Sequence, residues 1–114
     1  MPVMLGLDAA DAAAYVAQKL DWKRYKELRF EMERLCQALV DAQVGYLHAC
    51  GALDESGDTG EGEYDEDEAV EFILDRLCEQ FTDDDSRVVR YCELINDFLP
   101  LFDDYLLQAG LLSL

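Results

Sequence analysis

The chain has 114 residues, and 26 Asp and Glu against nine Lys and Arg give it a formal net charge of −17 at pH 7. A chain of this length can build one modest core, and a hydrophobic fraction of 51% argues against disorder throughout. The acidity repels nucleic acid and anionic membranes, whereas it attracts basic protein surfaces or cations. We therefore expect a single acidic domain over residues 1–114, with no direct nucleic-acid or membrane partner.

The N-terminal part predicts a first helix from Asp8 to Leu20. Asp8 is a suitable N-cap with Asp11 at the third helical position, and the alanine-rich run that follows has high helix propensity. The apolar start of the chain lacks the basic flank of a signal peptide, and no run reaches membrane-spanning length. The expected location is cytoplasmic.

Residues 21–53 carry the longest uninterrupted helical period in the chain. Asp21 is placed as a new N-cap after a bend, and apolar residues then recur at steps of three and four. These residues are Tyr25, Leu28, Met32, Leu35, Leu39, Ala42, Tyr46, Ala49 and Leu53. The pattern predicts one long central helix, against which the rest of the chain packs.

Residues 54–66 predict a mobile acidic loop, because they combine three glycines with many acids and contain no Lys or Arg. Helices are then expected at about 65–81 and from about Thr82 to Gly110, with Pro100 either kinking or splitting the last one. No strand pattern occurs. The predicted fold is all-α, a compact four- to five-helix bundle built around the helix at about 21–53.

The four cysteines, at positions 36, 50, 78 and 92, lie within apolar helical patterns and lack the close spacing of zinc or disulfide motifs. We interpret them as reduced core thiols. The only histidine, His48, precedes Cys50 by two residues, which places the two side chains on different sides of a helix. No catalytic residue, metal ligand or cofactor site is expected from them.

Two metal-dependent alternatives stay open. Asp54, Ser56, Asp58 and Asp65 match some ligand positions of a calcium-binding EF-hand loop, but Thr59 stands where the turn needs glycine. In the second alternative, a magnesium-dependent all-α nucleotide pyrophosphatase, Glu68 and Glu71 would form one acidic pair. Its second pair is only approximated, by Glu93 and Asn96.

The most informative pattern is a row of carboxylates at successive four-residue steps along the predicted third helix. Like charges at this spacing destabilise a helix, so a uniformly acidic face is better explained by a basic partner. Acids of the preceding loop extend the same surface. The candidate partner-binding residues are Asp67, Glu71, Asp75, Glu79 and Asp83 of the row, with Glu61, Glu63 and Asp65 before it.

In size, helicity and charge the chain resembles small acidic proteins that imitate nucleic acid and block restriction, CRISPR or other DNA-binding proteins. That resemblance implies a non-enzymatic inhibitor or regulator that occupies the basic groove of a nucleic-acid-binding protein. The alternative is an assembly or adaptor protein that acts through the apolar seam of residues 21–53, by homodimerisation or by binding a partner helix.

Overall fold

The computed structural model describes residues 6–54, 56, 60–81 and 85–110, and its regular structure there is helical. The prediction of an all-α bundle is confirmed. The elements in chain order are α1 (Ala9–Lys19), the 3-10 helix η1 (Lys26–Glu31), α2 (Met32–Ala49), α3 (Glu66–Phe81) and α4 (Asp85–Gln108).

Helix α1 begins as its sequence predicts. The carboxylate of Asp8 accepts a hydrogen bond from the backbone N–H of Asp11 at 3.1 Å, which satisfies one of the unpaired donors at the helix start. The helix buries Ala12, Ala13 and Val16. Small side chains on this face allow α1 to pack closely against α2.

The predicted helix over 21–53 is wrong in its bounds, because residues 26–31 form a 3-10 helix and α2 begins at Met32. The physical reason lies in a distant residue. The guanidinium of Arg90 donates to the carbonyl of Arg24, the group to which the N–H of Leu28 would bond in an α-helix. Leu28 bonds instead to the carbonyl of Tyr25 at 2.9 Å, the shorter 3-10 connection.

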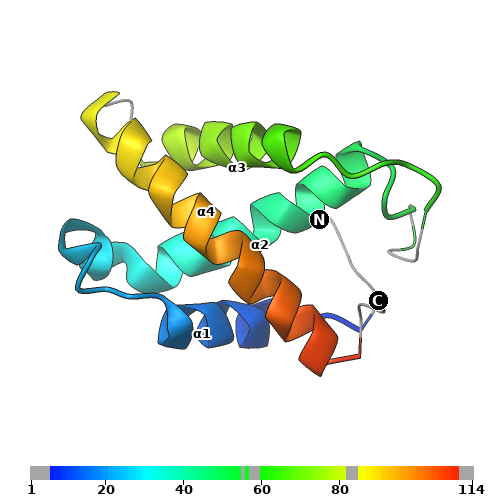
Figure 1. Ribbon diagram of the computed structural model, residues 1–114, viewed down its shortest axis with the longest axis horizontal. Coiled ribbons are helices and arrows are strands. Elements are labelled where there is room, and N and C mark those ends of the chain that lie inside the picture. Colours follow the sequence, from blue (N-terminus) through cyan, green and yellow to red (C-terminus); the bar gives the residue numbers. More distant parts are fainter. Residues whose placement is uncertain (1–5, 55, 57–59, 82–84, 111–114) are drawn as a thin grey trace.

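Helix α2 is nevertheless the centre of the bundle, since it contacts α1, η1, α3 and α4. Figure 1 shows α4 running obliquely across the other helices from one corner of the molecule to the opposite one. The core lies between these helices. Its largest fully buried side chains are Tyr25, Tyr91, Phe98, Phe102, Leu28, Leu35, Leu39, Ile73, Leu77, Leu94, Ile95 and Val16.

Helix α3 matches its predicted range closely. Helix α4 has 24 residues and is longer than α2, and it continues through Pro100 without being split. Gly110 follows its end with a φ of 76°, a left-handed conformation that favours glycine after a helix. The predicted N-cap of this last helix, Thr82, lies outside the described residues.

A polar network fastens η1 to α4. The hydroxyl of Tyr25 donates to the carboxylate of Asp97, and Arg24 pairs with both Asp97 and Glu93 at 3.1 and 3.2 Å. Arg90 pairs with Glu93 at 2.9 Å, and its guanidinium carbon lies 5.0 Å from the centre of the Tyr25 ring. The contacts of Arg24 and Tyr25 with α4 join segments about 70 residues apart in sequence, so they depend on the folded bundle.

None of the described helices combines the length and the apolar character that crossing a bilayer requires. All four cysteines are present as thiols, with Cys36 fully buried and the other three half-buried.

Candidate acidic interface

Helix α3 divides its residues between two opposite faces. Ala69, Ile73 and Leu77 are fully buried and attach the helix to the core. The acids of the predicted row that are described, Asp67, Glu71, Asp75 and Glu79, are all exposed. Asp83, the last predicted member of the row, lies outside the described residues.

These four carboxylates form no ion pair with any other described residue. Arg76 is the one basic residue of α3 and is close enough in sequence to neutralise part of the row. The structure instead stacks its guanidinium on the ring of Phe72, with 5.0 Å between the guanidinium carbon and the ring centre. The carboxylates are therefore presented to solvent without a described counterion.

Backbone hydrogen bonds tie residues 60–62, which precede α3, to residues 51–52, which follow α2. The N–H of Gly60 donates to the carbonyl of Ala52 at 2.9 Å, and the N–H of Gly62 donates to the carbonyl of Gly51 at 2.8 Å. A Cβ on Gly62 would lie 1.9 Å from the carbonyl oxygen of Cys50, so only glycine fits this close approach. The contact fixes the chain on both sides of Glu61.

Glu61, Glu63 and Asp65 are exposed, as expected for members of a binding surface. Asp65 also has a structural role that the sequence prediction missed. One of its carboxylate oxygens accepts from the backbone N–H groups of Asp67 and Glu68, at 2.9 and 3.3 Å, which caps the start of α3. Its own N–H donates to the hydroxyl of Tyr46 at 3.3 Å, so the first turn of α3 is tied to α2.

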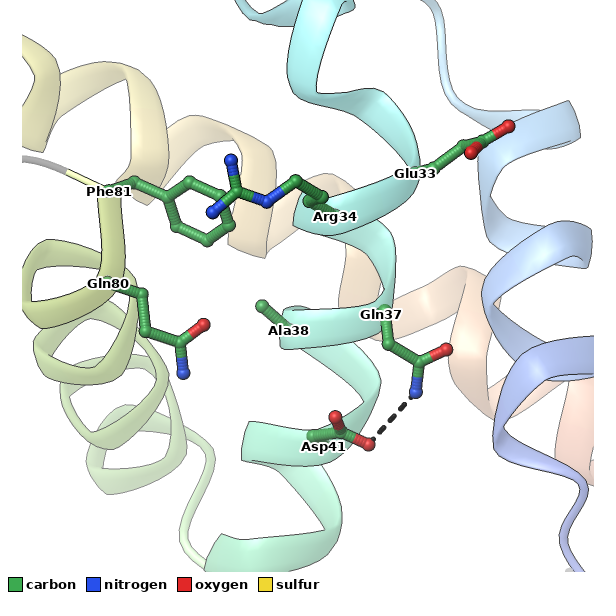
Figure 2. Close-up of a pocket in the computed structure, with 7 residues that line it drawn as sticks. All are labelled: Glu33, Arg34, Gln37, Ala38, Asp41, Gln80 and Phe81. Carbon is green, nitrogen blue, oxygen red and sulfur yellow. Dashed lines mark hydrogen bonds between the residues drawn. The ribbon is translucent and has the colours of Figure 1, made fainter.

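A shallow groove lies between α2 and the end of α3. Figure 2 shows the Arg34 side chain of α2 extending toward the Phe81 ring of α3, and the guanidinium carbon lies 5.2 Å from the ring centre. On the α2 wall Gln37 donates a hydrogen bond to Asp41 at 3.1 Å. Charges of both signs line this groove, and none of its lining residues belongs to the acidic row.

Asp103 is an acidic residue near the start of α3 that sequence reasoning did not select. Partial burial raises the pKa of this carboxyl above its ordinary value, and the charges of Glu66 and Asp104 add to the shift. Electrostatic coupling between Glu66 and Asp103 extends the acidic region from α3 to α4. The only sequence signal was the acidic pair at 103–104.

The described acids of the metal-dependent alternatives are not gathered into one cluster. No group of three or more His, Cys, Asp or Glu within the described part of the chain is arranged to hold a metal ion. Glu93 is engaged by Arg24 and Arg90, while Glu68 accepts from the hydroxyl of Tyr46 at 3.2 Å. Asp54 accepts from the backbone N–H and hydroxyl of Ser56, and Asp58 lies outside the described residues.

His48 and Cys50 do not form a nucleophile and base pair, as their spacing on one helix predicts. His48 is half-buried near the end of α2, and the thiol of Cys50 donates to the carbonyl of Leu47 at 3.6 Å. The acidic face of α3 with the segment at 60–65 is thus the candidate site with the most consistent chemistry.

No protein-family model, curated protein or solved structure matches this chain.

Proposed function

We propose that this protein is a non-enzymatic binding module whose acidic face occupies a basic protein surface, most concretely the groove of a nucleic-acid-binding protein. In this role it acts as an inhibitor or regulator that imitates the charge of a nucleic-acid strand. The acidic face consists of Asp67, Glu71, Asp75 and Glu79 on α3, with Glu61, Glu63 and Asp65 before it.

The observation that carries the proposal is the row of exposed carboxylates without ion pairs to described residues. Like charges four residues apart on a helix cost about 0.2 to 0.5 kcal/mol per step, so the three steps from Asp67 to Glu79 cost on the order of 1 kcal/mol before screening. A basic partner would turn this repulsion into attraction. Successive carboxylates about 6 Å apart also match the spacing of phosphates along a strand closely.

The alternative, assembly through the apolar seam of residues 21–53, has less support. Most of the seam is buried within the bundle, including Tyr25, Leu35, Leu39 and Tyr46. A partner helix could reach these side chains only if the bundle opened. The acidic face needs no such rearrangement.

The test begins with capture of proteins from the source cell on the immobilised chain at low salt. Each captured protein is then assayed for binding to a fluorescent DNA duplex or RNA strand, with the soluble chain as competitor. We expect a captured nucleic-acid-binding protein from which the chain displaces the labelled strand. Capture only of proteins that bind no nucleic acid, with retention that does not fall as salt rises, would contradict the proposal.

A matched pair of variants makes the test specific for the acidic face. The first removes three charges from the row through Glu71→Gln, Asp75→Asn and Glu79→Gln. The control removes three exposed charges elsewhere, through Asp11→Asn, Asp21→Asn and Glu33→Gln. Displacement should be lost in the row variant and largely kept in the control, although both change the net charge equally.

A further inference from the structure

The few basic residues of this chain are gathered at one end of the molecule. Of its nine Lys and Arg, six lie between residues 19 and 34 and two lie at positions 87 and 90 of α4. Figure 1 shows η1 and the start of α4 at one end of the long axis, and the segment joining α2 to α3 at the other. Most of the cations of the chain therefore lie at this end, where Arg24, Arg87 and Arg90 are paired with carboxylates of η1 and α4.

At this end the corner between α1 and η1 encloses a hollow of about 340 Å³. Leu20, Trp22 and Met32 contribute apolar atoms to its wall. The indole N–H of Trp22 donates to the carbonyl of Ala17 at 2.7 Å, which holds the ring in position. The hollow thus offers a fixed apolar surface to a small side chain.

Three cations surround this apolar surface: Lys23, Lys26 and Arg29. All three are exposed, and none forms an ion pair with a carboxylate of the described residues. The one acid in the wall is Asp21, whose carboxylate accepts from the backbone N–H of Lys23 at 3.0 Å. The rim of the hollow is therefore positive.

Phe30 is the second indication of a binding surface. Its side chain is 99% exposed, and it lines a neighbouring hollow that shares Arg29 and Met32 with the first. Exposed aromatic, Met and Arg side chains are enriched at the centres of protein interfaces. A phenylalanine with almost its whole side chain in solvent is suited to anchor a partner.

We propose that this hollow, with Phe30 beside it, binds a short acidic segment of a partner protein that carries an apolar side chain between its carboxylates. The apolar side chain enters the hollow against Trp22, and the carboxylates pair with Lys26 and Arg29. A nucleic-acid strand suits the site less well, because its continuous negative charge would meet the acidic remainder of the chain. The site is separate from the acidic face and does not depend on the proposed function.

Trp22 is the only tryptophan, so its fluorescence reports on the hollow directly. The full chain is titrated with a synthetic peptide in which glutamates flank a leucine or a phenylalanine on both sides. A peptide with glutamine in place of every glutamate and a single-stranded oligonucleotide serve as the other probes. We expect a saturable change in Trp22 emission with the acidic peptides, and no such change with the glutamine peptide or the oligonucleotide.

Two pairs of variants locate the binding. Lys26→Gln with Arg29→Gln should weaken peptide binding about three- to tenfold, and Lys19→Gln with Arg76→Gln, which changes the net charge equally, should not. Phe30→Ala should weaken it about fivefold or more, whereas Val89→Ala, which removes another exposed apolar side chain, should leave it unchanged. Circular dichroism checks that every variant remains helical.

The proposal is overturned if no acidic peptide changes Trp22 emission, if the oligonucleotide binds more tightly than the peptides, or if the Lys26 and Arg29 variant binds as the wild type does. The row variant at Glu71, Asp75 and Glu79 should bind the peptides normally. That result separates a failure of this site from a failure of the acidic face.

Discussion

The hydroxyl of Tyr25 donates a hydrogen bond to the carboxylate of Asp97, and this contact joins the segment before α2 to the middle of α4. Tyr25 is fully buried, and the guanidinium groups of Arg24 and Arg90 lie over its ring. One side chain thus links the apolar core to the charged network that holds η1.

Replacing Tyr25 by Phe should lower the free energy of unfolding by about 1 to 2 kcal/mol, because the change removes a half-buried hydrogen bond to a charged group. Tyr91→Phe is the matched control. Tyr91 is equally buried, but its hydroxyl has no hydrogen-bond partner among the described residues, so its removal should be neutral or stabilising. Urea unfolding of both variants measures the difference, and equal losses would show that the contact with Asp97 contributes nothing.

Alkaline pH should weaken the same contact. Burial raises the pKa of Tyr25 above its ordinary value of 10, and the hydrogen bond to Asp97 adds to the shift. The folded state therefore keeps the phenolic proton of Tyr25, which the unfolded state releases above pH 10. The stability that this hydrogen bond contributes is fully present below pH 10 and declines as pH rises above it.

The difference in unfolding free energy between the wild type and the Tyr25→Phe variant should accordingly shrink by about 1.4 kcal/mol per pH unit above pH 10. Urea unfolding at a series of pH values measures it. A difference that stays constant between neutral and strongly alkaline pH would be inconsistent with a protonated, buried Tyr25.

The backbone contact of residues 60–62 with residues 50–52 leaves no room for a side chain at Gly62. Gly62→Ala places a Cβ against the carbonyl of Cys50 and should lower the melting temperature by several degrees, about 1 to 3 kcal/mol in unfolding free energy. Glu61→Ala, at the exposed neighbouring position, should have little effect. A Gly62→Ala variant as stable as the wild type would show that the backbone contact is dispensable.

The thiols should differ in reactivity. Burial raises the pKa of the Cys36 thiol to about 12, so very little of it is thiolate at neutral pH. Cys36 is also buried, whereas the other three cysteines are half-buried and open to reagents. In the folded protein a thiol reagent should modify Cys50, Cys78 and Cys92 before Cys36, as mapped by peptide mass spectrometry. In guanidinium all four should react alike, and fast labelling of Cys36 in the folded state would contradict its position in the core.

Local sequence signals predicted the helices that local contacts determine. The cap at Asp8, the range of α3 and the end at Gly110 all follow from neighbouring residues. The start of α2 could not be predicted in this way, because the periodicity of Tyr25 and Leu28 fits both an α-helix and a 3-10 helix. The contact that decides between them comes from Arg90, more than 60 residues later.

For the acidic face, the exposure of Glu71 and Asp75 followed from the four-residue period, since the apolar residues of α3 occupy the other side. The capping role of Asp65 was also readable in principle, because acids commonly precede helices. The stacking of Arg76 on Phe72 and the coupling of Asp103 to Glu66 depend on side-chain packing in three dimensions, which periodicity does not encode.

The most direct test of the acidic face is the rate at which the chain associates with its captured partner, measured by stopped flow over a range of salt concentrations. Opposite charges accelerate encounter, and salt screens them. We predict that association of the wild type slows steeply as salt rises. The variant at Glu71, Asp75 and Glu79 should associate more slowly at low salt and respond less to salt than the control variant at Asp11, Asp21 and Glu33. If the two variants associate at the same rate at low salt, the face of α3 is not the binding surface.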